Sequence, residues 1–333
     1  MILRPGRRRP RALATLVATT GALFALVGAA HGATNLSLVA YSTPQDAYDA
    51  LIPAFQKTAA GKGVTFSESF GASGDQSRAV ANGLPADVVA FSLQPDLDRL
   101  VQAGLVSTSW NQDAFKGMVT RSVVVLIVRK GNPKKIKTWT DLVKPGVDVL
   151  VPNWQTSGGA KWDVMAAYGA QRKAGRSDDE GRQYLRDLYK NVSVQDKSAR
   201  ESLQTFSSGK GDVLIGYENE AIYAKQHGIP LSYVIPKNTI LIENPIAALQ
   251  TSSHLKQAKA FVAFAHTPQA QAFFASKGYR PVLPALANSK KIKKAFPRPK
   301  GLFTINSLGG WPSINRFFFD PANGVVVKAQ RGQ

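Results

Sequence analysis

The chain has 333 residues, of which 44% are hydrophobic and 19% charged, a composition that supports more than one compact domain and excludes disorder throughout. It has no cysteine, which excludes disulfide bonds, thiolate chemistry and cysteine-based zinc sites. The formal net charge of +20 is expected either of a protein with anionic partners or of one whose charge serves solubility.

The first 32 residues have the pattern of an export signal. Basic residues between Arg7 and Arg11 precede an apolar stretch at 12–29, and small residues at 30 and 32 fit a cleavage site before Ala33. The apolar stretch is near spanning length, so an uncleaved membrane anchor is the alternative. No later segment has ~18 consecutive apolar residues. We therefore expect a signal peptide at 1–32 and a soluble mature protein in the periplasm.

Strand-like runs alternate with helix-like segments along most of the mature chain. The runs that helix-like segments follow are 36–41, 64–70, 87–91, 148–152, 192–194 and 212–216. The longest strand-like run is 121–129, and a long helical pattern spans 254–278. This alternation predicts an α/β fold with a parallel sheet covered on both faces.

Five polar turns lie between a strand and the start of a helix. They follow Tyr41, Phe70, Asn153, Gln195 and Gly216. In an open α/β sheet, such turns lie at the carboxyl ends of strands, where ligands bind. Two small domains facing each other would bring all five into one cleft. Helix capping explains any one turn, but the joint pattern favours a ligand site.

The turn Ser157-Gly158-Gly159 is the clearest candidate for an anion site. A helix start leaves backbone N–H groups without helical partners, and the absence of side chains at the two glycines lets an anion approach them. The positive end of the helix dipole adds to the attraction.

Motifs for catalysis are missing from the sequence. The Ser73 turn departs from the G-x-S-x-G elbow at Asp75, and His227, His254 and His266 fall in helix-like stretches. The sequence has no phosphate loop, metalloprotease or calcium-loop motif. The turns are thus predicted to hold an anion without transforming it. We expect no enzyme activity and no metal or cofactor, with a secreted serine hydrolase as the alternative.

The basic cluster between Lys290 and Lys300 is the densest in the mature chain. It lacks the interleaved aromatic residues of a nucleic-acid surface, so nucleic-acid binding is not expected. A solvated face or a surface that adheres to polyanions remains open.

Six ordered blocks of sequence resemble the bacterial sulfate/thiosulfate-binding proteins of ABC importers. The blocks are Gly71-Ala72-Ser73-Gly74, Arg129-Lys130-Gly131-Asn132-Pro133, Lys144-Pro145-Gly146-Val147, Ser157-Gly158-Gly159-Ala160-Lys161-Trp162, Leu188-Tyr189-Lys190-Asn191-Val192 and Glu218-Asn219-Glu220-Ala221. The resemblance runs from about residue 36 to 280, and segments at 302–304 and 309–311 resemble the family's C-terminal extension.

The resemblance implies a two-lobed periplasmic-binding-protein fold of type II that closes over a dehydrated oxyanion. Residues 33–120 and 243–333 would form the first lobe and residues 121–242 the second. The family holds its anion with neutral donors. Carried over by position, these are the Ser157 hydroxyl, the backbone N–H groups of Ser42, Ser73, Gly158, Gly159 and Ala199, and the side chain of Tyr217. Arg200 would brace the loop beside Ala199.

Three positions depart from the family pattern. Tyr217 stands in place of a tryptophan, Asp75 in place of a common lysine, and Ser42 in place of a common aspartate. A phenol can accept a hydrogen bond as well as donate one, and Asp75 could also accept one. We therefore predict a monomeric binding protein that delivers sulfate or thiosulfate to the membrane permease subunits of an ABC importer, with phosphate-like oxyanions as the alternative ligands.

Overall fold

The structure, a computed structural model, describes residues 34–333. The predicted signal peptide lies outside the described residues. Within 34–333, no helix combines the length and the apolar character that crossing a membrane requires.

One mixed sheet of eleven strands forms the centre of this part of the chain, with its main path ordered β2-β1-β3-β9-β4-β7-β5-β6. The strands are β1 (Thr34–Tyr41), β2 (Val64–Gly71), β3 (Val88–Ala90), β4 (Met118–Arg129), β5 (Val149–Leu150), β6 (Val192–Val194), β7 (Val213–Tyr217), β8 (Leu231–Val234), β9 (Asn238–Ala248), β10 (Arg280–Pro281) and β11 (Gly301–Phe303). Strands β1 to β3 pair in parallel, and so do β5 to β7. The prediction of parallel strands is confirmed for these two groups.

Two long strands, β4 and β9, join the two parallel groups and run antiparallel to each other and to their neighbours in the main path, while β11 pairs with β9 in parallel. The first half of β4 pairs with β9 and its second half with β7. The end of β9 pairs with β3. The alternation of strands and helices along the chain did not indicate these antiparallel pairs, which join segments far apart in the sequence.

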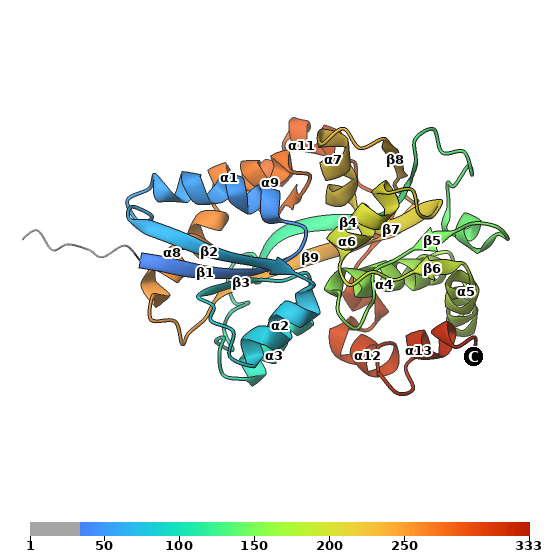
Figure 1. The fold of residues 1–333 in the computed structure, drawn as a ribbon, viewed down its shortest axis with the longest axis horizontal. Coiled ribbons are helices and arrows are strands. Elements are labelled where there is room, and N and C mark those ends of the chain that lie inside the picture. Colours follow the sequence, from blue (N-terminus) through green and yellow to red (C-terminus); the bar gives the residue numbers. More distant parts are fainter. Residues whose placement is uncertain (1–33) are drawn as a thin grey trace, which may run out of the picture. The chain divides into compact units, whose positions relative to one another are not determined.

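Helices cover both faces of the β1–β2–β3 group, with α1 and α9 on one side and α2 and α3 on the other (Figure 1). Both faces can be covered because successive side chains of β1 point to opposite faces of the sheet. Leu36, Leu38 and Ala40 pack in the core that contains α1, while Val39 packs with residues of α2 and α3. The α-helices here are α1 (Gln45–Gln56), α2 (Ser73–Ala81), α3 (Gln94–Gln102), α8 (Leu255–Ala265) and α9 (Pro268–Ser276).

The helical pattern predicted at 254–278 is two helices, α8 and α9. Thr267 caps α9 by accepting a hydrogen bond from the Ala270 N–H at 3.3 Å, and Pro268 occupies the first turn. Proline lacks the N–H that a continuous helix would need at this point, so the chain starts a new helix instead.

Most of the remaining helices lie around the β5–β6–β7 group or belong to the C-terminal segment, while α10 contacts α9 and β10 and α11 contacts α10 (Figure 1). They are η1 (Trp139–Val143), α4 (Gly158–Lys173), α5 (Asp178–Lys190), α6 (Ala199–Ser207), α7 (Glu218–Gln226), α10 (Pro284–Ala287), α11 (Lys290–Ala295), η2 (Ile305–Leu308), α12 (Gly310–Phe317) and α13 (Val325–Gln330). Helix α4 is buried along most of its length, and its apolar residues belong to the main core.

The last thirty residues pack on α4 and α5. A Cβ atom at Gly169 would lie 2.3 Å from the Phe303 ring, so only glycine lets β11 approach α4 this closely. Trp311 stacks edge-on against Trp162 with ring centroids 4.7 Å apart, and α13 contacts α5. The sequence-based division placed residues 243–333 in the first lobe. These contacts join residues 301–333 to elements of the segment 121–242, and the division into lobes stays a prediction.

Candidate functional site

Three helices start where a strand has just ended, and their first turns hold four of the predicted backbone donors. Ser73 begins α2 after β2, Gly158 and Gly159 begin α4 after β5, and Ala199 begins α6 after β6. N–H groups in a first helical turn have no carbonyl partner within their own helix. The Ser157 hydroxyl caps α4 by accepting from the Ala160 N–H at 3.4 Å. The N–H groups of the two glycines precede that bond and are available to a ligand.

The start of α4 brings several predicted residues together. A Cβ atom at Gly159 would lie 3.3 Å from Ser157 Oγ, 3.5 Å from Ala199 Cβ and 3.6 Å from Tyr217 Cε1. Residues from β7 and the starts of α4 and α6 therefore border the same small space. A side chain at residue 159 would intrude on that space, which explains the glycine.

The start of α2 meets the start of α4 from the other parallel group. The Gly74 N–H donates to the Thr156 carbonyl at 2.9 Å. The Ser73 hydroxyl donates to Asp96 Oδ2 at 2.6 Å and accepts from the Ser92 N–H at 3.0 Å. Because the hydroxyl is engaged in this way, Ser73 can offer an anion only its backbone N–H, which is the role that the resemblance assigns to it.

Ser42 lies in the turn after β1, and this turn faces α6. The carbonyl of the next residue, Thr43, accepts a hydrogen bond from Arg200 Nη2 at 3.0 Å. Arg200 also forms two hydrogen bonds to the Glu220 carboxylate, at 2.9 and 3.0 Å, and stacks over the Tyr223 ring at 3.7 Å. Burial lowers the pKa of Arg200, but the charge of Glu220 and its hydrogen bonds, with smaller effects of Tyr279 and Tyr223, together outweigh burial and raise it. Arg200 thus stays charged and holds the Ser42 turn near Ala199.

Tyr217 ends β7 and is 1% exposed. Burial raises the pKa of its hydroxyl well above the ordinary value, and the neighbouring Tyr41 adds to the effect. The phenol therefore keeps its proton, which it donates to Ser92 Oγ at 3.4 Å. Tyr217 is thus a neutral group that borders the start of α4.

Comparison with known proteins shows the family of the chain. A sequence profile described as "Bacterial extracellular solute-binding protein" matches residues 36–280. The chain belongs to this family. A "Sulfate-binding protein" of Synechococcus elongatus is 42% identical over 86% of this chain and 83% of that protein. A "Sulfate-binding protein" of Escherichia coli K12 is 36% identical over 91% of this chain and 95% of that protein.

A solved structure shares the fold of this solute-binding protein. "The sulfate-binding protein SubI from Mycobacterium tuberculosis H37Rv" superposes with a TM-score of 0.84 and 46% identity, over 86% of this chain and all of that one. The fold is that of type II periplasmic binding proteins, as predicted.

Asp75 in this solute-binding protein is held by two cations. Its Oδ1 accepts from Arg78 at 2.5 Å, and its Oδ2 lies 3.3 Å from Lys197 Nζ. Arg78 also donates to the Gln155 carbonyl at 3.0 Å. These contacts link α2 to the turns before α4 and α6. The carboxylate is engaged there, so it is a poor candidate for the ligand acceptor that the sequence left open.

Sequence reasoning missed Ser92. Its carbonyl accepts from Trp162 Nε1 and from Asn244 Nδ2, both at 2.8 Å, and its hydroxyl accepts from Tyr217. A Cβ atom at Gly158 would lie 2.3 Å from Ser92 Oγ. Ser92 follows the third strand just as Ser42 and Ser73 follow the first two. Its place directly after a strand could have identified Ser92 from the sequence, but no glycine or helix-capping pattern marks this turn.

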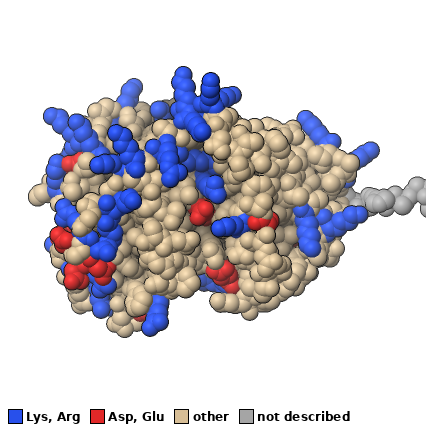
Figure 2. All heavy atoms as spheres, turned by 180° about the vertical axis from the view of Figure 1, so that it is seen from behind, with Lys and Arg blue, Asp and Glu red and all other residues tan. Residues whose placement is uncertain are grey.

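Basic side chains spread over the face seen in Figure 2, with acidic ones in small groups. This distribution agrees with the net charge of +20 and raises the local concentration of anions. Among residues 34–333, no cluster of three or more His, Asp or Glu side chains could hold a metal ion.

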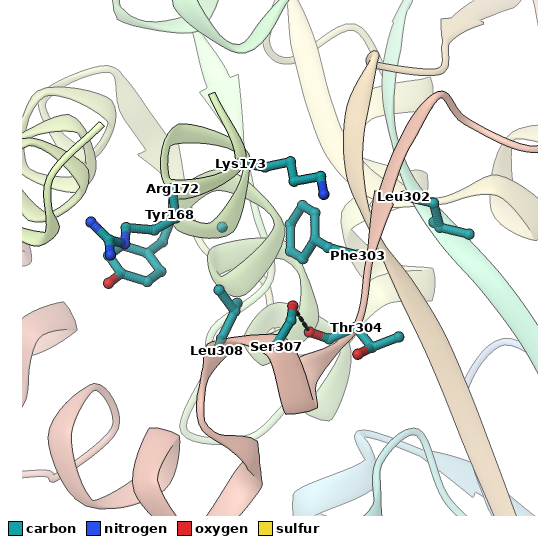
Figure 3. Close-up of a pocket in the computed structure, with 9 residues that line it drawn as sticks. Tyr168, Arg172, Lys173, Leu302, Phe303, Thr304, Ser307 and Leu308 are labelled. Carbon is teal, nitrogen blue, oxygen red and sulfur yellow. Dashed lines mark hydrogen bonds between the residues drawn. The ribbon is translucent and has the colours of Figure 1, made fainter. Parts of the chain in front are cut away.

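A surface cavity of about 550 Å³ lies at the other end of α4, between that helix, β11 and η2 (Figure 3). Tyr168, Lys173, Phe303 and Leu308 are among its lining residues, and none of the predicted ligand residues is. This end of α4 presents carbonyl groups and the negative end of the helix dipole, which disfavours an anion. The cavity is therefore separate from the candidate anion site.

Proposed function

We propose that this protein captures sulfate at the starts of α2, α4 and α6 and delivers it to the membrane permease subunits of an ABC importer. The observation that carries the proposal is the convergence of Ser157, Gly159, Ala199 and Tyr217 within a few ångströms of one another. The sulfate-binding relatives described above support the same ligand. Thiosulfate is the second candidate, because it is also a dianion that offers only hydrogen-bond acceptors.

The chemistry of the site suits a fully ionised oxyanion. The proposed ligand groups are the N–H groups of Ser42, Ser73, Gly158, Gly159 and Ala199, with the hydroxyls of Ser157 and Tyr217. All of them are neutral, and helix dipoles supply the positive potential. The nearby charged groups are paired elsewhere: Asp96 with Arg99 at 3.2 Å, and Arg200 with Glu220.

We propose binding rather than hydrolysis. The histidines that a serine hydrolase would need lie in other contacts. His227 is the cap residue after α7, His254 precedes α8 beside Asp87, and His266 contacts the Met118 carbonyl. The Ser73 hydroxyl donates to Asp96 instead of to an imidazole base.

The remaining features of the proposal follow from the family and the sequence. We propose that residues 1–32 direct export to the periplasm and that the protein acts as a monomer. We also propose that two lobes meet at the site, with residues 301–333 joined to the lobe formed by 121–242 on the contacts described above.

Isothermal titration calorimetry with sulfate tests the proposal. Ser157→Ala removes a hydroxyl that would bond to a charged ligand, so we expect sulfate affinity to fall by about 10- to 150-fold, equivalent to ~1.5–3 kcal/mol. Ser177→Ala is the matched control, because Ser177 caps α5 in the same way, at 3.2 Å from the Glu180 N–H, away from the site. The proposal fails if neither heat nor a rise in unfolding temperature accompanies sulfate, thiosulfate, phosphate or molybdate.

A further inference from the structure

Ser92 has contacts with three of the proposed ligand residues. It is 1% exposed, its N–H donates to the Ser73 hydroxyl, and its own hydroxyl accepts from Tyr217. The same hydroxyl lies against Gly158. Trp162 and Asn244 fix its carbonyl from α4 and β9. The backbone of Ser92 is thus held at every polar atom, while its hydroxyl is free to rotate.

The Tyr217 phenol donates its proton to Ser92 Oγ at 3.4 Å. With that proton directed at Ser92, the phenol oxygen faces its other neighbours with lone pairs only. An indole N–H, which the family has at residue 217, can only donate. The Tyr217 oxygen can therefore accept a hydrogen bond from a ligand, which an indole N–H cannot do. The phenol's own buried proton stays paired with Ser92 while it does so.

This difference matters for protonated ligands. Phosphate carries at least one proton near neutral pH, and a site of pure donors leaves that proton unpaired, at a buried cost of ~1–3 kcal/mol. Sulfate has no proton and is served by the proposed backbone N–H donors and the Ser157 hydroxyl. Two carboxylates near the site are already engaged, Asp75 by Arg78 and Lys197 and Asp96 by Arg99 and the Ser73 hydroxyl.

We propose that the Ser92–Tyr217 hydroxyl pair sets the ligand range of this protein, so that it binds protonated tetrahedral oxyanions, of which hydrogen phosphate is the type, as well as fully ionised ones. The inference rests on the proposed anion-binding function. Ser92 acts as a positioning residue, because it sets the direction in which the Tyr217 hydroxyl points. Asn244 is also close to that hydroxyl, but its Oδ1 already accepts from Thr120 at 3.2 Å.

The test compares the dissociation constants of phosphate and sulfate by calorimetry near neutral pH, with selenate as a second fully ionised anion. Wild-type protein is expected to bind all three. Ser92→Ala keeps the backbone bonds and removes only the hydroxyl, so phosphate should weaken by about 5- to 150-fold relative to sulfate. Tyr217→Trp introduces a pure donor and should change the phosphate-to-sulfate ratio in the same direction.

Ser202→Ala is the matched control. Ser202 is a fully buried serine in α6 whose hydroxyl has no hydrogen-bond partner among residues 34–333, so its removal should leave the ratio unchanged. Thermal unfolding without anion checks that each variant is folded, and Ser92→Ala decides the matter if Tyr217→Trp does not fold.

The inference is overturned if wild-type protein binds sulfate but not millimolar phosphate, or if Ser92→Ala leaves the phosphate-to-sulfate ratio unchanged. Failure of every anion to bind overturns the proposed function as well, and the sulfate measurement distinguishes that result from a failure of the inference alone.

Discussion

Asp163 gives the sharpest prediction about stability. It lies in α4, is 1% exposed, and neither carboxylate oxygen has a hydrogen-bond partner among residues 34–333. Burial raises its pKa well above the ordinary value. A negative charge on Asp163 also raises the pKa values of Tyr189 and Tyr217, although burial has the larger effect on both.

The raised pKa fixes the sign of the pH dependence. Below the ordinary pKa of an aspartate, about 3.9, the carboxyl is neutral in both the folded and the unfolded chain. As the pH rises, the unfolded chain ionises first and is stabilised, so folding stability is lost up to the raised pKa of the folded state. The aspartate therefore reduces the free energy of unfolding at neutral pH.

Asp163→Asn keeps the size of the side chain and cannot ionise. We expect it to leave stability nearly unchanged at pH ~4 and to raise the free energy of unfolding at pH ~7 by about 1–3 kcal/mol, the scale on which an unpaired buried polar group costs. Urea unfolding at several pH values, without sulfate because a ligand would add its own stabilisation, measures the change.

Asp141 provides a control of opposite sign. Its carboxylate accepts from the N–H groups of Lys137 and Thr138, both at 2.9 Å, and from Lys144 at 2.5 Å. Burial raises its pKa, but these bonds outweigh burial and lower it. The stability that Asp141 contributes is present above the ordinary pKa and lost as the pH falls, so Asp141→Asn should destabilise at neutral pH. If Asp163→Asn also destabilises at neutral pH, the carboxylate has a partner and the reasoning is wrong.

Two further substitutions probe the site. A Cβ atom at Gly158 would lie 2.0 Å from Leu93 Cδ2 and 2.3 Å from Ser92 Oγ. Gly158→Ala should therefore displace the start of α4 and weaken sulfate binding by at least about tenfold. An unchanged affinity in calorimetry would show that the neighbouring side chains adapt. Arg200→Ala leaves Glu220, which is 2% exposed, without its cation, so the free energy of unfolding measured with urea should fall by ~3–5 kcal/mol. A variant as stable as wild type would contradict this reasoning.

Local signals in the sequence were sufficient to predict the helix starts. The Ser157-Gly158-Gly159 turn could be identified because a cap serine and two glycines act within one helical turn, and the structure has α4 begin at Gly158. The polar turns predicted after Phe70 and Gln195 likewise lead into helices, α2 beginning at Ser73 and α6 at Ala199. The Thr267-Pro268 start of α9 was an equally local signal that the long helical pattern obscured.

The tertiary structure decided which of these starts lie together. Ser92 and Tyr217 are 125 residues apart in the chain, and their contact depends on β4 and β9 running antiparallel between two parallel groups. The packing of Phe303 over Gly169 likewise joins the C-terminal segment to α4 across a long stretch of chain. Capping and turn chemistry are set by neighbouring residues, so the sequence by itself determined where the helix α4 starts. Strand order and burial depend on contacts between distant residues, so only the fold decided that the Tyr217 hydroxyl would have Ser92 as its partner.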